Sequence, residues 1–212
     1  MNRRFDSHLF WGSHSPLSAL SGAGLILLAS TRFAFALICA GALIWVYGLS
    51  ALIFSGARSI MPKRGRMVIL LFLSTFLCGI FMFLVGLLNP LIILGMGFFL
   101  ILVPPYCLST GLFEASEPEY PGEVFSRALL EAIVMANVIL ALALIREPLG
   151  MGTLSFPGGV QGIVELFNSQ EDSFVPVRLL SASAGGLLLL GYVVALYRYF
   201  RERNGSVPEE QR

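Results

Sequence analysis

Six apolar runs set the main constraint on how this chain can fold. A bilayer core about 30 Å thick needs about 20 apolar residues per straight helix, and four of the runs reach that length. The runs are Leu17–Ala29, Phe33–Phe54, Val68–Leu88, Leu91–Cys107, Val124–Ile145 and Leu179–Tyr199. Hydrophobic residues make up 56% of the 212 residues and charged residues 13%, more apolar surface than a soluble globule can bury. We therefore predict an all-α integral membrane protein with six transmembrane segments in one polytopic domain.

The same composition excludes several classes of function. The net charge is only +1, and no basic stripe stands apart from the apolar runs, so we expect no nucleic-acid partner. Cys39, Cys78 and Cys107 are scattered through apolar runs, which argues against a disulfide framework. His8 and His14 lack partners at ligand spacing, so no zinc site held by this chain alone is expected.

Basic residues predict the orientation in the membrane. With the N-terminus inside, eleven of the fourteen lysines and arginines fall in inner loops and tails, and only Arg32, Arg146 and Arg178 fall outside. The positive-inside rule then places both termini in the cytoplasm. The first apolar segment continues too far for a signal peptide, and we expect it to remain as an anchor.

Two of the six segments carry defects. The first is short and contains Gly22 and Gly24, and the fourth contains Pro104-Pro105, which a regular helix interior does not accommodate. Non-helical backbone at membrane depth is tolerated only where it is buried in protein or lines a cavity. Each defect alone is equally compatible with close helix packing or a kink. Together they favour broken half-helices in segments 1 and 4 as the candidate functional centre.

The order of the segments indicates an internal repeat. A short segment and two long ones are followed by a broken segment and two long ones, so the second set of three enters from the opposite side. We predict a 3+3 inverted repeat, with the first repeat at about 11–88, the second at about 90–200 and a basic cytoplasmic tail at 200–212.

Polar residues within the apolar runs are weaker candidates. Glu131 suggests an ion or proton path, but Arg127 lies four residues earlier and an i,i+4 ion pair is the favoured reading. Asn137 suits either a cation ligand or, preferably, a hydrogen bond to a neighbouring helix.

The segment after the fifth run is rich in glycine and proline, and we expect a long loop over Arg146–Arg178. Gly150-x-Gly152-Thr153 lacks the lysine and the strand–helix context of a phosphate-binding loop. The glycines are more simply explained by the chain folding back at the outer surface, where Arg146 and Glu147 anchor it.

Two strings resemble a known family. Arg146-Glu147-Pro148-Leu149-Gly150-Met151-Gly152-Thr153-Leu154 resembles the Arg-Glu-x-x-Gly-x-Gly-Thr-Leu-Phe signature of the NqrD/RnfE (RsxE) membrane subunits. These belong to the sodium-translocating NADH:quinone reductase and to Rnf electron-transport complexes. The string from Cys107 through Gly111 to Ala115 resembles the family's Cys-Ile-Val-x-Gly-Arg-Ala-Glu-Ala, and Leu17, Leu20 and Gly22 fall on family positions.

The resemblance implies a subunit with no activity of its own. Such subunits pair with an inverted-topology sister, NqrE or RnfA, in the bacterial inner membrane, together with the other subunits of the complex. Half-helix cysteines from the two subunits hold a shared [2Fe–2S] cluster, and electron transfer through the membrane is coupled to Na⁺ or H⁺ translocation. Cys107 takes the second cysteine position and is the predicted cluster and metal ligand, while Gly22, Gly24, Pro104, Pro105 and Gly111 shape the half-helix breaks.

The chain also departs from the family pattern. Gly24 occupies the position of the first cysteine, and Leu112 replaces the arginine after the motif glycine. Water or a sister-subunit ligand would have to replace the missing thiolate, or the cluster is absent. Two other functions therefore stay open: a small secondary transporter or permease component with a midplane substrate site, and a scaffold paralogue without a cluster.

Overall fold

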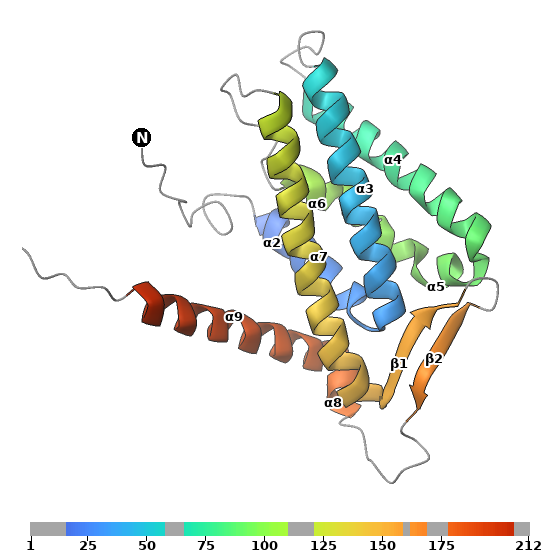
Figure 1. Cartoon of the computed structure of the whole chain (residues 1–212), viewed down its shortest axis with the longest axis vertical. Coiled ribbons are helices and arrows are strands. Elements are labelled where there is room, and N and C mark those ends of the chain that lie inside the picture. The colour runs from blue at the N-terminus through green and yellow to red at the C-terminus, as the bar shows by residue number, and fades with distance from the viewer. Residues whose placement is uncertain (1–15, 58–65, 110–120, 159–161, 169–177, 206–212) are drawn as a thin grey trace, which may run out of the picture.

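A computed structural model describes residues 16–57, 66–109, 121–158, 162–168 and 178–205. These residues form eight helices and a two-stranded sheet (Figure 1). In chain order, the elements are α2 (Pro16–Ala29), α3 (Phe33–Ala57), α4 (Arg66–Leu88), α5 (Pro90–Leu100), α6 (Val103–Ser109), α7 (Pro121–Met151), β1 (Thr153–Pro157), β2 (Ile163–Asn168), α8 (Arg178–Ser181) and α9 (Ser183–Gly205).

The core lies between α3 and α7, which run antiparallel and form the most extensive helix contact in the fold (Figure 1). Small residues allow the two backbones to approach closely. The buried alanines of these helices include Ala36, Ala42, Ala51, Ala128, Ala132 and Ala143. Gly48 continues this packing, because a Cβ placed there would lie 3.8 Å from the ring of Phe125.

Three of the described helices are long and apolar enough to cross a membrane. They are α3, the Val68–Leu88 part of α4 and the Gly122–Met151 part of α7. The other apolar helices are shorter, including Pro90–Leu100 and Ser183–Leu196. The mostly helical, membrane-type fold is as predicted, and the six-segment inverted repeat stays a prediction.

The first apolar segment is short, as expected, but the break expected at its glycines is not found. Helix α2 runs without interruption through Gly22 and Gly24 and ends at Ala29. A turn over residues 30–32 separates it from α3, and Ser30 N and Thr31 N still donate to the carbonyls of Ile26 and Leu28. The glycines therefore do not break the segment; the polar Ser30-Thr31-Arg32 turn ends it.

The fourth segment is broken, as predicted, at Ile101–Leu102 between α5 and α6. Pro104 and Pro105 follow the break and occupy the first turn of α6, where a proline needs no N–H partner. The break therefore lies just before the prolines. At the other end of α5, the Asn89 side chain accepts a hydrogen bond from Ile92 N at 3.2 Å, and Pro90 occupies the first turn.

The predicted loop after the fifth segment contains regular structure, which corrects the expectation. Helix α7 continues to Met151, six residues beyond the apolar run, and includes Pro148. Strands β1 and β2 then form an antiparallel hairpin with a register irregularity between Leu154 and Ser155. Gly152 (φ +69°) and Gly162 (φ +85°) adopt the left-handed backbone conformation at the start of each strand.

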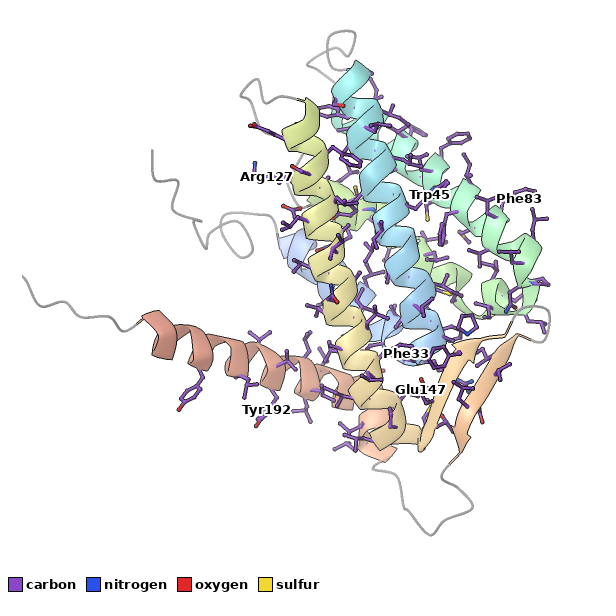
Figure 2. All side chains as sticks on the ribbon, in the orientation of Figure 1. Phe33, Trp45, Phe83, Arg127, Glu147 and Tyr192 are labelled. Atoms are coloured by element: carbon purple, nitrogen blue, oxygen red, sulfur yellow. The ribbon has the colours of Figure 1, made fainter. Side chains whose placement is uncertain are left out.

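The last predicted segment is divided at Ala182 into α8 and α9. Helix α9 extends to Gly205, beyond residue 200, where we expected the tail to begin. Whereas α4 packs along α3, α9 leaves the end of α7 at a steep angle (Figure 1). The labelled side chain of Tyr192 points away from the bundle (Figure 2).

Candidate functional site

The first and fourth apolar segments meet where helix α2 packs against helix α6. Helix α6 packs against α2, α3 and α4, and the Cys107 side chain on α6 is completely buried. A Cβ at Gly22 of α2 would lie 3.1 Å from the ring of Tyr106 and 3.9 Å from Met135 of α7. Gly22 therefore lets α2 lie directly against the turn of α6 that carries the thiol. This brings together predicted residues from the two halves of the chain.

Helices α3 and α7 contribute polar groups near the contact between α2 and α6. The buried Tyr47 donates its hydroxyl to the Tyr106 carbonyl at 3.4 Å, and the two rings lie 6.0 Å apart. Glu131 is near enough to interact electrostatically with Cys107 and with Arg127. Its Oε2 is buried without a hydrogen-bond partner within the described part of the chain. The sequence marks Glu131 as a buried-acid candidate but does not indicate that it faces the same region of the fold as Cys107.

The structure also locates the other two cysteines. Cys39 on α3 and Cys78 on α4 are buried, and Cys78 Sγ donates to the Leu100 carbonyl at 3.3 Å. Cys78 thus contacts the α5–α6 break, which its position in an unbroken helix did not reveal. The described residues contain no group of three histidine, cysteine or acidic side chains able to hold a metal ion. In those residues, Cys107 is the sulfur donor at the meeting of α2 and α6.

A second polar centre lies at the lower end of α7. The buried Arg146 guanidinium donates five hydrogen bonds to the end of α2 and to the corner between α8 and α9. Nε donates to the Leu180 carbonyl (2.8 Å), Nη1 to the Leu27 carbonyl (2.7 Å) and Ser30 Oγ (3.1 Å), and Nη2 to the Ser181 and Ala182 carbonyls (3.1 Å each). Carbonyls at helix ends lack partners within the helix, and one planar cation satisfies several of them.

Glu147 interacts with the N-terminal end of helix α3. Its Oε2 accepts a hydrogen bond from the backbone N–H of Phe33 at 2.5 Å, at the start of α3 (Figure 2). Its Oε1 accepts from Thr153 Oγ1 at 3.5 Å, at the start of β1. Arg146 therefore caps the negative end of α2, and Glu147 the positive end of α3, as helix dipoles favour. The two residues hold both sides of the α2–α3 turn against α7.

Glycines make room for these contacts. A Cβ at Gly150 would lie 2.8 Å from the backbone nitrogen of Ser181. One at Gly186 would lie 3.0 Å from Arg146 Cζ. Gly150 thus allows α8 to pack against α7, and Gly186 allows α9 to start beside the guanidinium.

A sequence model of the family described as "Rnf-Nqr subunit, membrane protein" matches residues 8–196. The chain belongs to this Rnf-Nqr subunit family. The search of curated proteins found no match.

For this Rnf-Nqr subunit, the structure places the string Arg146 to Thr153 in a single structural junction. Arg146, Glu147 and Thr153 form the hydrogen bonds just described, Gly150 contacts α8 and Gly152 supplies the turn into β1. Arg146 and Glu147 lie within the helix and not in the expected loop, and their anchoring at the membrane interface stays a prediction.

Other candidates lie apart from this junction or outside the described residues. Asn137 is exposed on α7 and donates to the Ile133 carbonyl of its own helix at 2.8 Å, and the favoured hydrogen bond to another helix is not found among the described residues. Gly24 has open space around it, because no atom of the described residues lies within 4 Å of an added Cβ. Gly111, His8 and His14 lie outside the described residues.

Proposed function

We propose that this chain is the NqrD/RnfE-type membrane subunit of an Rnf- or Nqr-type complex, and that it supports electron transfer across the bilayer coupled to Na⁺ or H⁺ movement. The family match over residues 8–196 supports the membrane-subunit role. The observation that carries the finer proposal is the position of Cys107 on α6, the helix at which the first and fourth segments meet. An inverted-topology NqrE/RnfA-like sister is the proposed partner, because the described residues alone bring together too few donors for a redox centre.

The cofactor proposed for this site is a [2Fe–2S] cluster shared with the sister subunit. In the described residues this region offers one sulfur donor, which suits a shared cluster and not one held by this chain alone. Cys107 would supply one thiolate, carried on α6. When bound, such a cluster supplies one-electron transfer.

The proposed location is the bacterial inner membrane with both termini in the cytoplasm. The end of α3, the start of α4 and the start of α7 lie at the same end of the bundle (Figure 1). Arg66 begins α4, and Arg127 lies near the start of α7. An accumulation of basic residues at this end supports its placement on the inner side.

A scaffold without a cluster is the second candidate, and two observations favour it. Gly24 replaces the first family cysteine, and Cys107 has no exposed surface through which a partner's cluster would reach it. Such a subunit would hold its sister in place without binding iron.

Iron content and EPR of the anaerobically isolated complex distinguish the two candidates. The redox proposal predicts a paramagnetic signal on reduction that is lost in Cys107→Ser, while the matched variant Cys39→Ser retains it. Iron bound equally by wild-type and Cys107→Ser complexes would refute the role of Cys107. A stable complex without iron at this subunit would favour the scaffold, and solute uptake by the chain alone in liposomes would favour a permease.

A further inference from the structure

The Arg146 guanidinium connects three parts of the chain that are far apart in the sequence. It is carried on α7, the long helix of the core, and its donors reach the end of α2 and the α8–α9 corner. Helix α2 has only 14 residues. A short helix has few contacts to fix its position along its own axis, so a polar contact at its end has a large effect on that position.

The position of α2 matters because of what faces it. Gly22 lies five residues before Leu27, whose carbonyl accepts the 2.7 Å hydrogen bond from Arg146. The added-Cβ distance of 3.1 Å from Gly22 to the Tyr106 ring shows that this contact is already tight. A shift or rotation of α2 would replace Gly22 with a bulkier neighbour opposite Tyr106. Helix α6 would then have to move, and Cys107 with it.

We propose that Arg146 is a positioning residue that sets α2 against α6 and thereby keeps the Cys107 thiol enclosed. All three guanidinium nitrogens are used, and together they donate five hydrogen bonds, whereas an ammonium group has only three donors. Gly186 leaves the space that the guanidinium plane occupies. This role of Arg146 deepens the proposed function and rests on it in one respect: the proposed function is what makes Cys107 important.

The test is the rate at which N-ethylmaleimide modifies Cys107 in the full-length chain, expressed without partners and purified in mild detergent. Peptide mass spectrometry would follow Cys107 and Cys39 separately in one sample. Cys39 is also completely buried, but it lies on α3. It therefore reports general loosening of the fold. In Arg146→Gln, we expect Cys107 to react at least about tenfold faster while Cys39 keeps its wild-type rate.

Two further variants make the result decisive. Arg32→Gln removes a half-exposed arginine from the α2–α3 turn, 4.0 Å from Glu165, and should leave both rates unchanged. Arg146→Lys keeps the charge with fewer directed donors and should give an intermediate Cys107 rate. It also provides the measurement if the Gln variant does not fold. An unchanged Cys107 rate, or equal acceleration at Cys39 and Cys107, would overturn the proposal. Because the assay uses no iron, its failure is distinct from failure of the redox proposal.

Discussion

Replacing Glu147 with glutamine tests whether a buried negative charge at the start of α3 stabilises the fold. Glu147 is 1% exposed, and its Oε2 accepts the 2.5 Å hydrogen bond from Phe33 N. Glutamine keeps the size and an acceptor oxygen but removes the charge. A buried charge at a helix end contributes up to about 2 kcal/mol. Charge-assisted hydrogen bonds are about twice as strong as neutral ones.

We expect Glu147→Gln to lower the free energy of unfolding by about 2 kcal/mol, since these two effects overlap in one contact. For a chain of this size, each kcal/mol corresponds to about 2–4 °C in Tm. The variant should therefore melt about 4–8 °C lower in detergent, measured by circular dichroism or intrinsic fluorescence. Glu147→Ala should melt lower still, because Phe33 N and Thr153 Oγ1 then both lose their acceptor.

The matched control is Glu165→Gln, which removes the same charge from a half-exposed side chain 4.0 Å from Arg32. Exposed ion pairs contribute at most about 1 kcal/mol, so this variant should melt close to the wild type. The opposing effect is the desolvation of the buried carboxylate, which a neutral glutamine avoids. A Glu147→Gln protein as stable as the wild type would mean that desolvation outweighs the helix-end interaction, and our reasoning would be wrong.

Three further substitutions probe the rest of the structure by thermal unfolding. Gly150→Ala should lower the free energy of unfolding by about 1–3 kcal/mol, because its Cβ would lie 2.8 Å from a backbone nitrogen of α8. Gly191→Ala is the control: no described atom lies within 4 Å of its Cβ, so this variant should be as stable as the wild type or slightly more stable. Equal effects of the two would contradict the close α7–α8 packing. Asn89→Ala should cost about 1–2 kcal/mol, since the side chain caps α5 and donates to the Gly162 carbonyl at 2.9 Å, and Asn137→Ala is the exposed control. Gly24→Cys should fold normally, because its Cβ has open space. If the redox proposal holds, this variant should also raise the iron content of the complex. A large loss of stability would contradict the open space around Gly24.

Much of the helical layout follows from the sequence alone. Apolar runs of membrane-spanning length predicted α3, α4 and most of α7, because in lipid the backbone must satisfy its own hydrogen bonds. Pro104-Pro105 predicted that the fourth segment would be broken. These features depend on local chemistry, which is visible in a single stretch of sequence.

The structure of the junction at the end of α7 does not follow from local chemistry. Arg146 and Glu147 seemed to end the fifth apolar run, since charges are costly in a buried helix. They continue the helix because their partners, Thr153 apart, come from α2, α3 and the α8–α9 corner, each more than 30 residues away. No periodicity shows such partners. The signal that did exist was the spacing of glycines after the Arg-Glu pair, which indicated close backbone contacts without saying which elements would meet.

The burial of Cys107 also determines what a shared cluster would require. A thiol that binds a cluster between two subunits must reach the interface, yet no surface of Cys107 is exposed in this chain. Helix α2 is one of the elements packed against α6, and it is short, with its end held by hydrogen bonds from Arg146. Moving α2 uncovers one side of α6 without separating α3 from α7, which form the largest contact in the fold. A redox subunit would therefore have to displace α2 when its sister docks, whereas a scaffold would keep α2 in place. The accessibility of Cys107 in the assembled complex, compared with the chain alone, is the physical difference between the two proposals.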